Sequence, residues 1–238
     1  MIQFIKKILK LSPVPLSKNH RYDLQTQKII KGLRPDSNCI DVGCFKGEIL
    51  DLIIKAAPQG KHFGIEPIPI QYKELEKKYR QQPNVRILNY AASNQTGESS
   101  FNYVTSNPSY SGLKKRDYDK PNEVDQSITV KTAPLDELIP KELKIDLIKI
   151  DVEGAELLVL EGARQIIAHH HPIVIFEHGL GASEHYGATP EKLFAFFSSL
   201  DMKISNLGSY LKKQNSLSQE DFKKQYYDRL NYYFVAFF

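Results

Sequence analysis

The residues best suited to chemistry stand directly after predicted buried strands. The first such strand, residues 38–42, contains Asp41 and continues into the loop Gly43-Cys-Phe-Lys-Gly47. Two glycines in one short loop let the chain turn tightly and approach a ligand with its backbone, and the helix that follows presents free N–H groups. The carboxylate of Asp41 would repel a phosphate but attract an amine. The loop is therefore predicted to hold an amine-bearing ligand.

A second carboxylate follows the next predicted strand. Residues 62–66 end in Glu66, 19 positions after Gly47. An acid at this distance from a glycine loop is typical of a group that binds the hydroxyls of a ribose. Phe45 stands where the middle glycine of Gly-x-Gly-x-x-Gly would be, which leaves less room for a pyrophosphate. A ribose and an amine without a pyrophosphate indicate S-adenosylmethionine (SAM) as the cofactor, not NAD.

Three side chains that can move a proton follow two later strands. Asp151 follows residues 145–150, and Glu177 and His178 follow residues 171–176. Parallel strands end at the same edge of a sheet, so all three are expected at one rim. Asp151 or His178 is the predicted base for a hydroxyl, with Glu177 as a hydrogen-bonded acid beside it. No metal site is predicted, but these three groups also offer oxygen and nitrogen ligands, so a metal-assisted reaction stays open.

The elements that must position these residues alternate between strand and helix. Helices are expected at 47–57, 70–80, 155–169 and 190–200, and further strands at 85–89, 100–104, 127–131, 202–205 and 231–238. Such alternation indicates a parallel sheet with crossover helices. The predicted fold is α/β and doubly wound (Rossmann-like), with about seven mostly parallel strands and an antiparallel last strand.

Two polar stretches interrupt this alternation, and we treat them as insertions at 98–131 and 206–230. Within the first, residues 105–126 are expected to form a mobile surface loop. This loop and the stretch 206–230 carry five tyrosines, namely Tyr110, Tyr118, Tyr210, Tyr226 and Tyr227. The two stretches either fold over the site as a lid that binds the acceptor or simply pack on the surface.

From roughly residue 20 to 205, the sequence resembles the FkbM-type SAM-dependent methyltransferases. The matching segments are Ile40–Gly47, Gly64–Pro67, Asn89–Glu98, Ile145–Glu156 and Pro172–Glu177. The resemblance implies a class I methyltransferase fold and methyl transfer to a hydroxyl. It also implies a cofactor site in which Asp41, Gly43, Cys44, Phe45 and Gly47 hold the methionine half of SAM, Glu66 takes the ribose, Ala91 and Ala92 lie along the adenine, and Asp151 sits beside the reacting end. The family usually has Ala-Asn where this chain has Cys44-Phe45.

The function expected from these features is O-methylation of a hydroxyl on a sugar, a glycan or a small metabolite. Two alternatives remain: a SAM-binding partner protein without catalysis, and an RNA methyltransferase. Residues 1–38 hold eight Lys/Arg and two acids, whereas residues 39–238 have a net charge of −2. Nucleic-acid binding depends on Lys/Arg contacts to phosphates, so no nucleic-acid partner is expected.

Composition and the N-terminal segment set the remaining expectations. With 41% hydrophobic and 25% charged residues over 238 positions, the chain has an ordinary globular composition. We predict a basic amphipathic helical segment at 1–34 and a methyltransferase domain at 35–238. A helix at residues 1–12 would pack on the body or make weak contact with a membrane surface. The sequence does not indicate an oligomeric state.

The sequence also gives expectations for the cellular location of the protein and for its two cysteines. No run of 18 apolar residues exists, and lysines interrupt the start where a signal peptide would need an apolar core. The expected location is the cytoplasm, with or without peripheral contact to a membrane. Cys39 and Cys44 match no zinc spacing and are expected to be buried thiols.

Overall fold

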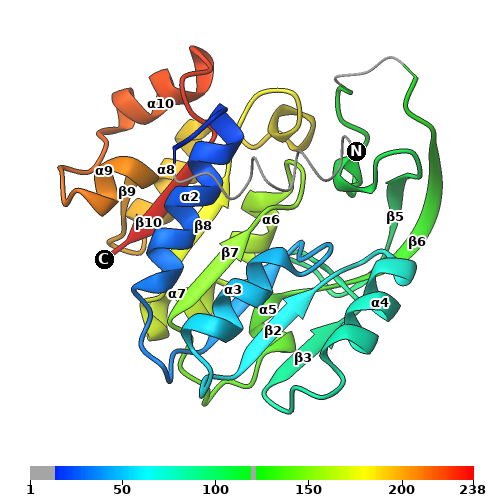
Figure 1. The fold of residues 1–238 in the computed structure, drawn as a ribbon. Coiled ribbons are helices and arrows are strands. Elements are labelled where there is room, and N and C mark those ends of the chain that lie inside the picture. Colours follow the sequence, from blue (N-terminus) through cyan, green and yellow to red (C-terminus); the bar gives the residue numbers. More distant parts are fainter. Residues whose placement is uncertain (1–13, 119–121) are drawn as a thin grey trace.

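A seven-stranded sheet forms the centre of the molecule (Figure 1). The computed structural model describes residues 14–118 and 122–238; the helix predicted at residues 1–12 lies outside this part of the chain. In spatial order the strands are β3 (Val85–Leu88), β2 (His62–Ile65), β1 (Cys39–Val42), β7 (Leu147–Ile150), β8 (Ile173–Glu177), β10 (Tyr233–Phe237) and β9 (Lys203–Asn206).

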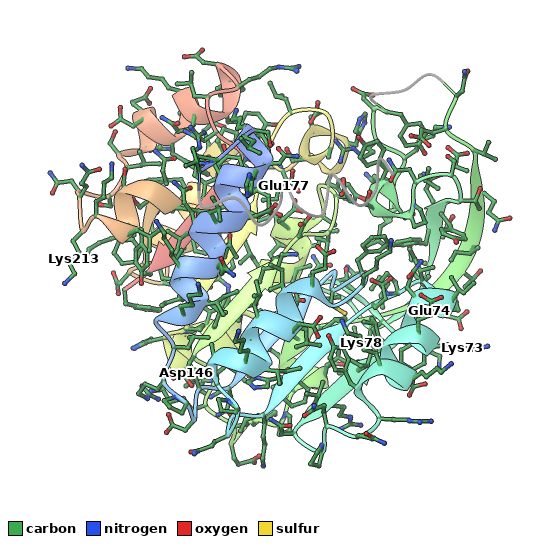
Figure 2. The ribbon with its side chains drawn as sticks, viewed as in Figure 1. Lys73, Glu74, Lys78, Asp146, Glu177 and Lys213 are labelled. Atoms are coloured by element: carbon green, nitrogen blue, oxygen red, sulfur yellow. The ribbon has the colours of Figure 1, made fainter. Side chains whose placement is uncertain are left out.

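The direction of the strands confirms the predicted mixed sheet. β10 runs antiparallel to both β8 and β9, and the other neighbouring pairs are parallel. Asp146 lies just before β7, at the amino ends of the parallel strands, and Glu177 ends β8, at their carboxyl ends (Figure 2). The chain winds from β1 through β2 to β3 on one side and resumes with β7 on the other. Ligands of doubly wound sheets bind at such a switch point, beyond the carboxyl ends of the strands.

Helices cover both faces of the sheet. One face carries α2 (Lys18–Lys31), α3 (Glu48–Ala56), α4 (Pro69–Tyr79) and α9 (Leu207–Leu211). The other face carries α5 (Leu135–Leu138), α6 (Glu156–Glu161), α7 (Arg164–His170), α8 (Pro190–Ser198) and α10 (Gln219–Tyr227). Every residue of β1, β2 and β7 is buried, as expected for strands covered on both faces. Cys39 and Cys44 are buried free thiols, as predicted.

A second, three-stranded sheet stands beside the first. It consists of β4 (Ala91–Ala92), β6 (Asp125–Ala133) and β5 (Gly97–Val104), in that order. After β5 the chain makes a short 3-10 helix, Pro108–Tyr110, and then turns back. Gly112 exchanges two backbone hydrogen bonds with Asn102 of β5, at 2.8 and 3.1 Å. The described part of the predicted surface loop is therefore folded against β5 and does not extend away from the body.

Two further segments differ from the sequence-based expectation. The helix predicted at 155–169 is divided into α6 and α7 at Gly162 and Ala163. A Cβ on Gly162 would overlap the backbone of Ser93, so this position requires glycine. The stretch 206–230, expected to be irregular, contains α9 and α10. Phe222 and Tyr226, four positions apart on α10, are both buried against the body. A spacing of four positions is typical of one face of a helix, but the segment is otherwise polar, and the sequence analysis did not predict a helix here.

Candidate active site

Two adjoining cavities open at the carboxyl edge of the central sheet. The first, of about 470 Å³, lies beyond β1 and β2, and the second, of about 500 Å³, lies beyond β8. Both volumes fall in the range of small-molecule sites. The two cavities meet at a junction lined by Tyr22, Asp23, Ser109, Asp151, Glu153 and Tyr233. Two ligands bound side by side would therefore face each other at these six residues.

The glycine loop after β1 forms one wall of the first cavity. Gly43 has a φ of +74°, and a Cβ there would overlap the carbonyl oxygen of Asp151. Gly47 has a φ of +73°, and a Cβ there would overlap the hydroxyl of Tyr79. Both positions require glycine because of the backbone conformation and because of the close approach. Gly43, Cys44 and Phe45 line the first cavity. Gly47 does not line it and contributes only to the conformation of the loop.

Asp41 presents a buried carboxylate to the first cavity. Its side chain is fully buried, and neither oxygen accepts a hydrogen bond from a described residue. The ammonium nitrogen of Lys149 lies 3.7 Å from Oδ1. Burial raises the pKa of Asp41 to about 6, and the charge of Lys149 opposes that rise. Burying a carboxylate without hydrogen bonds to its oxygens costs free energy. The ammonium group of a ligand could donate the missing hydrogen bonds to Asp41.

Glu66 is fixed at the wall of the same cavity by backbone groups. The N–H of Phe45 donates to Oε2 and the N–H of Ile68 donates to Oε1, both at 2.9 Å. Burial raises the pKa of Glu66 to about 7. Each oxygen retains a lone pair, so the group can accept hydrogen bonds from two neighbouring hydroxyls, as in a ribose.

The remaining wall of the first cavity is apolar. Ala91 and Ala92 of β4 line it, as the family resemblance implied, together with Ile68 and Phe101. Such a surface suits a flat ring system such as adenine. Phe101 belongs to β5, in the insertion, and its place in the cavity depends on how the second sheet packs. Sequence patterns carry no signal for that packing, and this residue was missed.

Four strands bring charged and polar side chains together at the junction. Lys149 of β7 stands opposite Asp41 of β1, and Glu177 of β8 stands opposite Tyr233 of β10. Asp151 follows two positions after Lys149 and lines both cavities. The Lys149 ammonium lies 3.2 Å from Asp151 Oδ2, and the hydroxyl of Tyr233 donates a hydrogen bond to the same oxygen. Tyr233 is a site residue that the sequence reasoning did not identify.

The two acids at the junction have opposite pKa shifts. Burial alone would raise the pKa of Asp151, but the charge of Lys149 and hydrogen bonding by Glu177, Tyr233 and Lys149 keep it below its ordinary value. Burial and the charge of Asp151 hold the pKa of Glu177 well above its usual range. The surroundings therefore favour the charged form of Asp151 and the neutral form of Glu177.

His178 is separated from this group. Its ring stacks on Tyr226 with centroids 4.5 Å apart and lies near Phe222, on the α10 side of β8. It is 1% exposed, lines neither cavity, and burial lowers its pKa to about 3. Consecutive residues of a strand point to opposite faces, so Glu177 and His178 cannot both face the junction. The structure thus brings Asp151 and Glu177 together and leaves His178 apart.

A third acid, Glu153, completes the acidic side of the junction. The carboxylates of Asp151, Glu153 and Glu177 lie within 4.8 Å of one another and could hold a metal ion. Arg116, from the insertion, forms an ion pair with Glu153, and Lys149 contacts Asp151. Two cations already compensate this cluster. The group available to a metal contains Glu153 in place of the expected His178.

The second cavity is lined mainly by segments that flank the central strands. Tyr22 of α2 donates a hydrogen bond to Asn231 Oδ1 at 2.8 Å, which ties α2 to the chain entering β10. Figure 2 shows Glu177 close to α2 at this edge. Of the five tyrosines in residues 105–126 and 206–230, Tyr110 and Tyr226 line the second cavity, and Tyr118, Tyr210 and Tyr227 line neither.

The fold and the site together define the class of protein. A doubly wound sheet with an antiparallel strand near its edge, a glycine loop after β1 and an acid after β2 is the arrangement of class I SAM-dependent methyltransferases. The sequence profile of the Methyltransferase FkbM domain matches residues 41–209. The chain belongs to the FkbM methyltransferase family.

A solved structure of an FkbM methyltransferase has a similar fold. The FkbM methyltransferase from Methylobacillus flagellatus KT is 18% identical with a TM-score of 0.54, over 87% of this chain and 45% of that chain. This chain therefore spans less than half the length of that protein. A SAM-dependent methyltransferase from Aquifex aeolicus is 12% identical with a TM-score of 0.42, over 99% of this chain and 95% of that chain. No curated protein matches. None of the described helices is both long and apolar enough to cross a membrane.

Proposed function

We propose that this protein transfers the methyl group of SAM to a hydroxyl of a sugar, a glycan or another small polyol. The observation that carries the proposal is the junction at Asp151, where a cavity suited to SAM meets a second, polar cavity. A methyltransferase needs this arrangement, because the methyl donor and the acceptor must be held in contact.

The first cavity matches the chemical parts of SAM. Asp41 offers an unsatisfied buried carboxylate to an amine, Glu66 offers two oxygens to a ribose, and Ala91, Ala92 and Phe101 offer an apolar wall to adenine. Bound SAM would supply an electrophilic methyl group. Asp41 and Glu66 would orient it, so that its reacting end faces Asp151.

Asp151 is the proposed base. An acceptor hydroxyl in the second cavity would give its proton to the Asp151 carboxylate while its oxygen bonds to the methyl carbon. The bond between that carbon and the sulfur of SAM would break, and S-adenosylhomocysteine would leave. Lys149 and Tyr233 keep this carboxylate charged and oriented. Burial and the charge of Asp151 raise the pKa of Glu177 and favour its neutral form, which could donate a hydrogen bond to Asp151. We give His178 no part in the reaction, because it faces the other side of β8.

The lining of the second cavity favours a polyhydroxylated acceptor. Hydroxyl, amide and carboxylate groups surround it, with aromatic rings among them, from Asn19, Tyr22, Glu156, Tyr226, Asn231 and Tyr232. Such groups form many hydrogen bonds with neutral hydroxyls, and aromatic faces suit sugar rings. Lys18, Arg116 and Arg229 also line this cavity, but Arg116 is paired with Glu153, and the acids at the junction disfavour the phosphates of a nucleic acid.

Transfer of label from methyl-tritiated SAM to fractionated cell extract tests the proposal. We expect label in a carbohydrate-containing fraction, with SAM binding but no transfer by Asp151→Asn. Binding without transfer to any fraction would indicate a non-catalytic SAM-binding protein. Label that disappears on nuclease treatment would indicate an RNA methyltransferase. Either outcome would contradict the proposed function.

A further inference from the structure

We propose that Tyr233 is a positioning residue that, with Lys149, holds the Asp151 carboxylate charged at the junction, so that Asp151 senses the charge on the methyl-bearing end of the cofactor. This inference rests on the proposed function. It also assigns a role to β10, which lies outside the part of the chain that matches the family profile. The last strand would then contribute to cofactor recognition as well as to the sheet.

Tyr233 occupies a fixed position. It lies in register with Glu177 on β8, and its ring packs against Tyr22 of α2 with centroids 5.4 Å apart. It lines both cavities, and its hydroxyl donates to Asp151 Oδ2. The ring is thus held between a strand and a helix while the hydroxyl reaches the junction. A phenylalanine would keep the packing and remove only the donor.

The surroundings of Asp151 explain why a neutral donor matters. Its charged and titratable neighbours come from β1, β7, β8, β10, α2, α6 and two loops: Asp41, Lys149, Glu177, Tyr233, Tyr22, Asp23, Glu156, Glu153 and Arg116. Arg116 is paired with Glu153, and Lys149 is shared with Asp41. One shared cation therefore faces Asp151 directly among the described residues. The hydrogen bonds from Tyr233 and Glu177 supply the rest of the stabilisation of its charge.

The two forms of the cofactor provide a probe of this charge. SAM carries a positive sulfonium, whereas its product S-adenosylhomocysteine (SAH) is a neutral thioether. Their amine, ribose and adenine are the same, so contributions from Asp41 and Glu66 cancel in the ratio of the two affinities. The ratio then reports mainly the charge that faces the reacting end. A charged Asp151 favours SAM over SAH, and protonation of Asp151 removes that preference.

The experiment is calorimetric titration of SAM and SAH into the full chain between pH 4.5 and 8. The pKa of Asp151 lies below its ordinary value, so the parent should keep its preference for SAM over this whole range. In Tyr233→Phe the loss of a donor raises that pKa, so the preference for SAM should fall toward the acid end of the range. Glu177→Gln keeps a neutral donor beside Asp151 and should follow the parent profile. Tyr210→Phe, on α9 and away from both cavities, is the matched control and should also follow the parent.

The outcomes separate this inference from the proposed function. An unshifted profile in Tyr233→Phe, or an equal shift in Tyr210→Phe, would overturn the inference while leaving SAM binding intact. A shift in Glu177→Gln as large as that in Tyr233→Phe would overturn it too, and this arm decides the matter if Tyr233→Phe does not fold. Failure of the parent protein to bind either ligand would instead contradict the proposed function.

Discussion

Lys149 on β7 faces Asp41 on β1, with its ammonium nitrogen 3.7 Å from Asp41 Oδ1. The same nitrogen lies 3.2 Å from Asp151 Oδ2, so one buried cation connects the wall of the first cavity with the junction. In the proposed function, Asp41 binds the amine of the cofactor and Asp151 receives a proton. Lys149 therefore balances the charge of both functional carboxylates.

Replacing this cation should destabilise the protein. Lys149→Met leaves the buried Asp41 and the partly buried Asp151 uncompensated, and removing one partner of a buried pair typically costs about 3–5 kcal/mol. We expect a loss of that size in the free energy of unfolding, measured with urea. Lys144→Met is the control, because Lys144 is exposed and lies 3.8 Å from Asp146; its effect should stay within about 0.5 kcal/mol. Equal effects would show that Lys149 does not compensate the site.

Cofactor affinity should increase with pH. The pKa of Asp41 is raised to about 6 and that of Glu66 to about 7, so both groups gain charge between pH 5 and 8. A charged Asp41 attracts the cofactor's amine, and SAH affinity measured by calorimetry should rise over this interval. Asp41→Asn should lower affinity about 10- to 100-fold at pH 8 and reduce the rise. Affinity that is constant with pH, in both proteins, would contradict the placement of the amine at Asp41.

The glycine loop permits a matched pair of substitutions. Gly43 and Gly187 have φ values of +74° and +63°, but only at Gly43 would a Cβ overlap the backbone of Asp151. Gly187→Ala should cost about 1–2 kcal/mol from backbone strain alone. Gly43→Ala should cost about 1–3 kcal/mol more and weaken SAH binding. Urea denaturation and calorimetry test both; equal stabilities and equal SAH affinities for the two variants would argue against the close approach.

His178 should be dispensable for methyl transfer. Its two ring nitrogens have no hydrogen-bond partner among the described residues, and its neighbours are aromatic. His178→Phe should keep the transfer of label from SAM and gain about 1 kcal/mol of stability, because an unsatisfied polar group is removed from the interior. Loss of transfer in a folded His178→Phe protein would restore His178 as a reacting group.

Much of the fold could be predicted because its signals are local. Apolar runs, breaking prolines and the glycine loop identify the main strands, and the acids that follow them mark the edge where ligands bind. The position of Asp41, Glu66 and Asp151 around one site follows from strand order alone. The antiparallel last strand was predicted for the same reason, since it follows a long stretch without a crossover pattern.

The rest of the site depends on tertiary packing. His178 was grouped with Glu177 because both end one strand, but the alternation of side chains separates them. Tyr233 and Phe101 come from a strand and a hairpin whose partners are distant in sequence. A tyrosine or a phenylalanine in a predicted strand is as common in a protein core as in a binding site, so the residue types alone did not indicate a site. The register of β10 against β8 decides which face carries the hydroxyl, and no local pattern specifies it.

A crystal structure of the complex with SAH would test the central claim most directly. The account predicts the SAH amine at the Asp41 carboxylate, the ribose hydroxyls at Glu66, the adenine between Ala91 and Phe101, and the sulfur facing Asp151 at the junction. SAH bound outside the first cavity, or no binding at millimolar concentration, would contradict it.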